Sequence, residues 1–169
     1  ALSGQASIVT VFGAGTTIDG RPYIVMDLMP NGSLTDRIKR DGSIPPTEVT
    51  QIGLELLDAI EAAHELGVLH RDIKPDNILI SRYGKPQLGD FGISTIPGGY
   101  ETTTGNVSAT FAYAAPEVIG GERPSTVSDL YSLAATLATL IMGGPAFPRA
   151  SGEAAPAWLA RLGLPARLV

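Results

Sequence analysis

The sequence predicts an α+β fold in which a short pair of strands precedes a mainly helical body. Two apolar runs near the start are rich in β-branched residues, and the segment between them contains the turn signal Asp19-Gly20. Further along, two long segments repeat apolar residues at helical spacing. With 169 residues, of which 44% are hydrophobic, the chain can bury a core as one domain.

Local signals place the first elements. The predicted strands cover residues 8–12 and 23–28, where β-branched and aromatic residues are frequent. Pro30-Asn31-Gly32 predicts a turn, and Ser33 follows it directly. Because a serine side chain can accept a hydrogen bond from a free N–H of the first helical turn, we expect Ser33 to cap a short helix over 34–40.

Hydrophobic spacing places the elements of the central part. A helix is expected to open at Pro45-Pro46-Thr47 and to end at Gly67, with its apolar residues on one face. Short apolar runs predict strands at 78–80 and 86–88. The stretch 92–112 is rich in Gly, Thr and Ser, so we expect a mobile loop there.

The last third of the chain is dominated by one apolar helix. A single helical turn is expected at 117–119, followed by a helix over 128–142 that should be buried on most sides. The uncharged stretch 130–147 is interrupted by polar residues, Gly and Pro, and its helical part is shorter than the ~20 residues of a membrane span. We therefore expect no membrane segment in this chain and a cytoplasmic location, although the full-length protein could be anchored through another segment.

Composition excludes several classes of site. The formal charge of −5 and the pI near 4.9 argue against non-specific nucleic-acid binding, which requires clustered Lys and Arg. The chain has no Cys and two His, so disulfides, Cys-based zinc sites and thiol catalysis are excluded.

Residues 70–77 carry the first chemical motif. They read HRDIKPDN and resemble the catalytic loop of protein kinases. The resemblance implies that Asp72 accepts the hydroxyl proton of the attacking side chain, that Asn77 ligates Mg²⁺ (or Mn²⁺), and that Lys74 contacts the transferred phosphate. Lys at this place is the pattern of Ser/Thr kinases rather than tyrosine kinases. The competing interpretation, an ordinary polar loop, is disfavoured by the length of the match and by two motifs downstream.

Those two motifs follow at the spacing of the same family. Asp90-Phe91-Gly92 comes after a short predicted strand, and the resemblance makes Asp90 the main Mg²⁺ ligand. Ala115-Pro116-Glu117 resembles the end of an activation segment, and Thr110 before it would hydrogen-bond toward Asp72 and Lys74. Each tripeptide alone would be a turn or a helix start, but together they favour the kinase interpretation.

The resemblance also implies a nucleotide site, with ATP as the cofactor. Residues 23–29 resemble the hinge strand that receives adenine. Met26 would lie at the back of the pocket, Asp27 and Met29 would belong to the hinge beside the base, and Leu79 would form the floor. For the apolar members of this set, packing in an ordinary core is the competing interpretation.

Positioning and regulation can be inferred in the same way. Asp129 matches the aspartate that holds the catalytic-loop backbone in the family, and it is also a carboxylate in the first turn of a helix, where the helix dipole favours it. The resemblance implies that Arg71 pairs with a phosphorylated residue of the activation segment, with Thr102, Thr103 and Thr104 as the candidate acceptors. The alternative for this threonine run is a solvated loop without modification.

The resemblance runs from about residue 8 to residue 147 and identifies the chain as part of a bacterial eukaryotic-type, non-specific Ser/Thr protein kinase. It implies a protein kinase-like fold, mainly the α-helical C-lobe plus the last strands of the N-lobe sheet. The partial catalytic domain would cover 1–150, with the end of the N-lobe and the hinge over 1–29 and the C-lobe over 30–150. Residues 151–169 would form a truncated tail.

Two functions follow as alternatives. The first is transfer of the ATP γ-phosphate to protein substrates, with a kinase–kinase dimer as a possible partner arrangement. The family's Gly-rich phosphate loop, β-strand Lys and helix Glu have no counterpart in the sequence, so we expect weak or no activity from this chain alone. The second is a non-catalytic kinase remnant that binds a substrate or another kinase. Intact Asp72, Asn77 and Asp90 favour the first.

Overall fold

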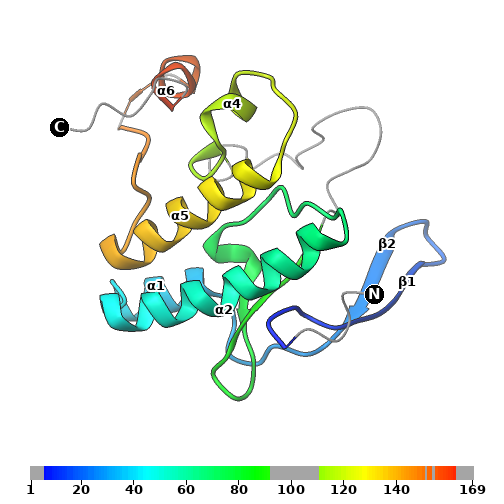
Figure 1. The fold of residues 1–169 in the computed structure, drawn as a ribbon. Coiled ribbons are helices and arrows are strands. Elements are labelled where there is room, and N and C mark those ends of the chain that lie inside the picture. Colours follow the sequence, from blue (N-terminus) through cyan, green and yellow to red (C-terminus); the bar gives the residue numbers. More distant parts are fainter. Residues whose placement is uncertain (1–5, 92–110, 151, 154, 163–169) are drawn as a thin grey trace.

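The computed structural model describes residues 6–91, 111–150, 152–153 and 155–162. A β-hairpin lies at one side of the molecule, and the helices form its main body (Figure 1). The predicted α+β class is therefore confirmed.

The hairpin consists of the antiparallel strands β1 (Val11–Thr16) and β2 (Pro22–Met26). The turn predicted at Asp19-Gly20 connects them, and Gly20 has a φ of 83°, which glycine adopts without steric strain. The second strand was predicted to reach residue 28, but β2 ends at Met26.

The first strand, predicted at 8–12, is placed wrongly. Ile8 forms an isolated parallel bridge with Leu88, and the Val9 N–H donates to the Leu88 carbonyl at 3.0 Å. Both Ile8 and Val9 are buried, so this apolar run joins the body rather than the hairpin. The β-branched composition predicts an extended backbone correctly, but it carries no information about the pairing partner.

The first two helices are close to their predicted places. In α1 (Leu34–Asp41), the Ser33 side chain accepts from the Asp36 N–H at 3.2 Å, and Asp36 Oδ2 accepts from the Ser33 N–H at 2.9 Å. This reciprocal pair is a capping box, and it satisfies N–H groups that have no partner inside the helix. The second helix, α2 (Pro46–Glu65), begins with Pro at its first position and buries one apolar face.

A short two-stranded sheet follows α2. The 3₁₀ turn η1 (Pro75–Asn77) leads into β3 (Ile78–Ile80), which pairs antiparallel with β4 (Pro86–Leu88). Both strands were predicted at these residues. Ile78 and Leu88 face each other in register and are fully buried, which fixes this sheet to the core.

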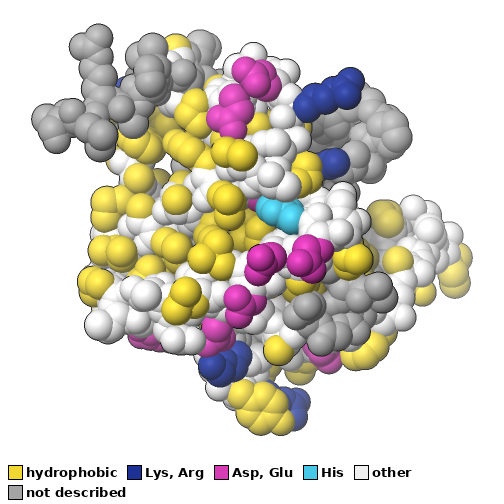
Figure 2. All heavy atoms as spheres, viewed as in Figure 1, with side chains coloured by type: hydrophobic (Ala, Val, Ile, Leu, Met, Phe, Trp, Pro, Cys, Tyr) yellow, Lys and Arg dark blue, Asp and Glu magenta, His cyan; other side chains and the backbone are white. Residues whose placement is uncertain are grey.

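Three helices complete the fold: α4 (Pro116–Ile119), α5 (Thr126–Met142) and α6 (Ala155–Leu162). A capping box between Ser125 and Ser128 starts α5 two residues earlier than predicted. Eight residues of α5 are buried, as expected for a helix covered on most sides, but part of its surface is open, with Leu130 and Met142 45% and 56% exposed. Hydrophobic side chains gather over α5 and the adjoining side of α2 (Figure 2). Apolar composition alone does not say which face of a helix is covered.

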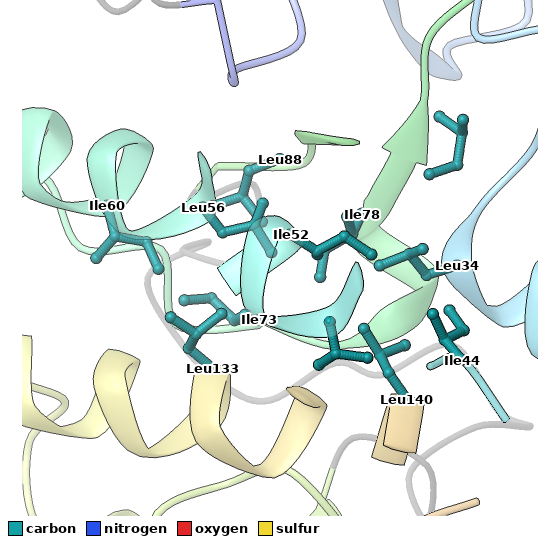
Figure 3. Packing of buried hydrophobic residues seen from close by; sticks show 12 residues of the cluster. Leu34, Ile44, Ile52, Leu56, Ile60, Ile73, Ile78, Leu88, Leu133 and Leu140 are labelled. Carbon is teal, nitrogen blue, oxygen red and sulfur yellow. The ribbon is translucent and has the colours of Figure 1, made fainter. Parts of the chain in front are cut away.

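Two apolar clusters hold these elements together. The larger one joins α1, α2, β3, β4 and α5 (Figure 3) and includes Leu34, Ile52, Leu56, Ile60, Ile73, Ile78, Leu88, Leu133 and Leu140. The smaller one packs Trp158 and Leu162 of α6 against Ala112, Tyr113 and Ala135. Within the described ranges, no helix has the length and apolar character needed to cross a membrane.

The helices α2 and α5 approach each other closely at Gly53. A Cβ built on Gly53 would lie 3.0 Å from Leu137 Cδ1, so the Leu137 side chain would have to shift to make room for a side chain at this position. This approach brings the end of α2 near the start of α5, and the catalytic-loop motif lies between them in the chain.

Candidate active site

The backbone of the motif 70–77 is fixed by a buried carboxylate on α5. Asp129 is fully buried; its Oδ2 accepts from the His70 N–H at 2.9 Å and its Oδ1 accepts from the Arg71 N–H at 2.8 Å. Two backbone donors that belong to no helix or strand thereby receive a charged partner. The interpretation of Asp129 as the residue that holds this loop is confirmed by these contacts.

His70 connects the loop to the segment that carries Asp90. Its Nε2 donates to the Gly89 carbonyl at 2.8 Å, its Nδ1 accepts from the Asp72 N–H at 3.3 Å, and its ring lies 4.6 Å from the Phe91 ring. Burial lowers the pKa of His70 below its ordinary value, although the Gly89 carbonyl acts in the opposite direction. The ring is therefore a neutral structural link, with one nitrogen donating and the other accepting.

Asp72 lies at the centre of a compact polar group. Lys74 Nζ donates to both of its carboxylate oxygens, at 3.0 Å to Oδ1 and 2.8 Å to Oδ2. Asn77 Nδ2 donates to the Asp72 carbonyl at 2.7 Å and to Oδ2 at 2.9 Å. The carboxylate is thus oriented by a cation and by an amide, while its side chain remains partly exposed to solvent. This arrangement can accept a proton from an incoming hydroxyl group.

Asn77 and Asp90 lie on two segments that are joined directly. The Gly89 N–H donates to the Asn77 carbonyl at 2.8 Å, and Asp90 is the next residue. Because Asn77 uses its amide nitrogen on Asp72, its Oδ1 is the atom left to offer to a cation. The described residues contain no cluster of three or more His, Cys, Asp or Glu side chains suited to a metal ion. An amide oxygen and one carboxylate suit a hard cation that also takes oxygen ligands from phosphate or water.

A hollow of about 280 Å³ lies between the hairpin and the end of β4. Met26, Val9, Ile24 and Leu88 give it an apolar lining, and Asp90 reaches its edge. Of the residues expected around adenine, Met26 lines this hollow. Sequence reasoning missed Val9 and Ile24, since their β-branched side chains look like ordinary strand residues.

The other residues expected at the nucleotide do not line this hollow. The Asp27 N–H donates to the Thr10 carbonyl at 3.0 Å, and the Met29 carbonyl accepts from the Gly32 N–H at 3.3 Å. The Leu79 side chain lies beside Gly89, 3.5 Å from the place of a Cβ built there.

Comparison with known proteins identifies the family to which the chain belongs. The protein kinase domain family matches residues 2–159. The chain belongs to the protein kinase family. The resemblance inferred from the motifs is therefore confirmed, and so is the kinase-like fold.

Relatives of this kinase chain include mycobacterial proteins. It is 49% identical over 152 residues to the serine/threonine-protein kinase PknK of Mycobacterium bovis, which covers 90% of the chain and 14% of that protein. It is 36% identical over 143 residues to the serine/threonine-protein kinase PknL of Mycobacterium tuberculosis, covering 83% of the chain and 35% of that protein. The chain thus spans a minor part of the length of these curated relatives.

The kinase site contains two residues with left-handed backbone. Arg71 has a φ of 70° and Asp90 a φ of 59°, which is unfavourable for residues with a Cβ, by roughly 1–2 kcal/mol each. Both lie beside groups that tie the backbone down: Asp129 accepts from the Arg71 N–H, and Gly89 next to Asp90 is bonded on both sides. The surrounding hydrogen bonds therefore offset the unfavourable backbone conformation of Arg71 and Asp90.

Four predicted residues lie outside the part of the kinase that the structure describes. These are the activation-segment threonines Thr102, Thr103 and Thr104 and the substrate-loop Thr110. Conversely, His64 was not singled out from the sequence, although the structure places its Nε2 2.8 Å from Asp129 Oδ2. No local signal marks it, because the two residues are 65 positions apart.

Proposed function

We propose that this protein is a Ser/Thr protein kinase that transfers the γ-phosphate of ATP to Ser and Thr hydroxyls of other proteins. The observation that carries the proposal is the hydrogen-bonded group of Asp72, Lys74 and Asn77. The backbone of their loop is fixed by hydrogen bonds to the buried Asp129 carboxylate. The relatives that support it are named serine/threonine-protein kinases.

In the proposed reaction, Asp72 accepts the proton of the substrate hydroxyl as its oxygen forms a bond to the γ-phosphorus. The bond between the γ-phosphorus and the bridging oxygen breaks, and ADP leaves. Lys74 is held 2.8 Å from Asp72 Oδ2, where its ammonium group can neutralise charge on the phosphoryl group in transfer. Asn77 keeps the Asp72 carboxylate in one orientation.

The proposal includes ATP with Mg²⁺ or Mn²⁺. Asn77 Oδ1 and the Asp90 carboxylate are the protein oxygens that would hold the ion, and the donor set fits because both are hard oxygen ligands on segments joined at Gly89. When bound, the ion neutralises charge on the phosphate oxygens. We place adenine near Met26, with Asp27, Met29 and Leu79 as further candidates for contact with the nucleotide.

Regulation, partners and location belong to the same proposal. We expect Arg71 to pair with a phosphate on Thr102, Thr103 or Thr104, and peptide mass spectrometry of the active protein would contradict this if all three were unmodified. Thr110 is expected to contact Asp72 and Lys74 when substrate binds. A cytoplasmic location and pairing with a second kinase chain remain predictions from the sequence.

The decisive experiment is Asp72→Asn in the full-length protein. The amide cannot accept the proton, so transfer of radiolabelled phosphate from ATP to a protein substrate should fall by about 10²- to 10⁴-fold. Asp76→Asn is the matched control, because it also replaces a carboxylate by an amide, but at an exposed position four residues later.

The outcomes separate the two alternatives. Wild-type transfer by the Asp72→Asn protein would contradict the proposed role of this residue. A non-catalytic binding module would show no transfer in either protein, and its affinity for substrate would be the same with Asp72 and with Asn at this position.

A further inference from the structure

The sheet of β3 and β4 is extended by a further segment at each edge, residues 6–9 beside β4 and residues 31–33 beside β3. At the β4 edge, the Leu88 N–H donates to the Ser7 carbonyl at 2.8 Å, and the Leu88 carbonyl accepts from the Val9 N–H at 3.0 Å. These two bonds are the pairing of a short parallel strand, which is therefore held by few backbone contacts.

A side chain of β4 adds a third bond at the start of segment 6–9. Gln87 Nε2 donates to the Ala6 carbonyl at 2.7 Å, although the two residues are 81 positions apart. Gln87 lies opposite Leu79 in the register of the two strands, so both side chains leave the sheet on the face away from the buried Ile78. The bond lies at the surface, and its removal therefore leaves no buried polar group unpaired.

The β3 edge has a matching contact. The Ile80 N–H donates to the Gly32 carbonyl at 2.8 Å. Directly beside this bond, Asn31 Nδ2 donates to the Ser81 carbonyl at 2.7 Å, again at the surface. Each edge of the sheet is thus tied to its neighbouring segment by one amide side chain that donates to a backbone carbonyl.

The two edge segments are also the two connections between the β1–β2 hairpin and the body. Segment 6–9 leads through Thr10 into β1, and β2 continues through Asp27 toward segment 31–33. The Asp27 N–H donates to the Thr10 carbonyl at 3.0 Å, so the two connections lie side by side. Among the described residues, the hairpin strands pair only with each other, beside the helical body (Figure 1). Movement of the hairpin against the body must therefore turn at these connections.

The hollow proposed for the nucleotide has walls on both sides of the connections. Ile24 and Met26 belong to the hairpin, whereas Val9 and Leu88 belong to the extended sheet. A rotation of the hairpin about its connections therefore changes the width of the hollow. Because a site that is already held in its binding shape binds more tightly than one that must first be ordered, bonds that limit this rotation favour the bound nucleotide.

We infer that Gln87 and Asn31 are positioning residues for the nucleotide: by tying the two connections of the hairpin to the edges of the β3–β4 sheet, they limit the opening of the hollow and slow nucleotide release. This inference rests on the proposed kinase function. Neither side chain touches the nucleotide or the transferred phosphate in this account. Their removal should therefore change dissociation of the nucleotide and leave the chemical step unaltered.

The test measures the release of a fluorescent ADP analogue with Mg²⁺ from the full-length protein by stopped flow. Gln87→Met keeps the length of the side chain but removes its donor, and should raise the dissociation rate about two- to fivefold. Because Asn31 acts at the other edge with different partners, adding Asn31→Ala should multiply the effect to about 4- to 25-fold. Gln51→Met is the matched control, since Gln51 Nε2 donates to Glu55 Oε1 at 3.1 Å within α2, and its release rate should equal that of wild type.

Two further measurements separate positioning of the nucleotide from a general loss of structure. In a single-turnover assay at saturating ATP, the rate of phosphate transfer by Gln87→Met should stay within about twofold of wild type. Hydrogen–deuterium exchange should become faster at the Val9 and Leu88 amides, whereas the amides around Leu56 in α2 keep their protection.

Several outcomes overturn the inference while leaving the proposed function intact. These are an unchanged release rate in both Gln87→Met and the double variant, an equal rise in Gln51→Met, or a fall in the single-turnover rate as large as the rise in release. Gln87→Leu replaces the methionine variant if that variant is unfolded. If both are unfolded, Gln87 supports the fold as a whole and the inference fails. Wild-type protein that binds no ADP analogue would instead contradict the proposed function itself.

Discussion

The catalytic loop, residues 70–77, and the hairpin of β1 and β2 are held by different kinds of contact. The loop backbone donates hydrogen bonds to the buried Asp129 carboxylate, and within the loop Lys74 and Asn77 donate to Asp72. The hairpin is held by the ladder between its own strands, and its apolar residues Phe12 and Val25 are 66% and 48% exposed. Removal of a loop partner leaves a buried polar group unpaired, whereas truncation of a hairpin side chain does not. Removing the same number of atoms should therefore lower the free energy of unfolding by very different amounts in the two regions.

The largest effect is expected for Asp129→Ala. It removes the acceptor of the His70 and Arg71 N–H groups and the partner of His64. We expect a loss of about 3–5 kcal/mol in the free energy of unfolding and no measurable phosphate transfer. Urea unfolding and the kinase assay on the full-length protein measure the two effects.

Asp58→Ala is the control for that substitution, because Asp58 is an exposed carboxylate on α2. Its unfolding free energy should stay within about 0.5 kcal/mol of wild type. A change in Asp129→Ala no larger than in this control would show that the loop is held by other contacts.

A smaller difference is expected between apolar truncations in the core and in the hairpin. Leu140→Ala removes a fully buried side chain from the larger cluster and should lower the free energy of unfolding by about 2–5 kcal/mol. Val25→Ala, in the half-exposed hairpin, should lower it by less than about 1 kcal/mol. Similar losses in urea unfolding of the two variants would mean that the hairpin is buried in the full-length protein.

The smallest effect concerns pH. Because burial lowers the pKa of His70 in the folded state, the unfolded state takes up the proton first as the pH falls. The stability that depends on neutral His70 is complete above about pH 6.5 and declines as the pH drops toward the folded-state pKa. His70→Gln can still donate to Gly89 but does not titrate, so Tm should fall less steeply on acidification than in wild type. Parallel pH profiles for the two proteins would contradict this.

Much of the helical body could be predicted from local sequence. The Ser33 cap, the span of α2 and the two short strands β3 and β4 follow from spacing, turn residues and capping chemistry. The motif at 70–77 also predicted that Asp72, Lys74 and Asn77 lie on one loop, and their side chains contact one another there.

What could not be predicted depends on contacts between distant segments. The partner of Ile8 is Leu88 rather than the hairpin, and the partner of Asp129 is His64, which lies on another helix. Burial decides both contacts, and a single sequence does not show which surfaces meet. The same limit applies to α5: its pattern indicated a helix buried on most sides but did not show that Leu130 and Met142 would lie on the exposed part.

The β3–β4 hairpin has an open end, where its two strands are not connected, and a closed end, where a turn joins them; different residues lie at the two ends. Asn77 and Asp90 flank the open end, where the Gly89 N–H and the Asn77 carbonyl are bonded at 2.8 Å. The closed end turns through Tyr83 and Gly84, both exposed, with Gly84 at a φ of 76°. A short affinity tag or a fluorescent label inserted after Tyr83 would therefore lie at the far end of a paired ladder, where a reporter can follow the molecule without altering the spacing of Asn77 and Asp90, the two residues proposed to hold the ion.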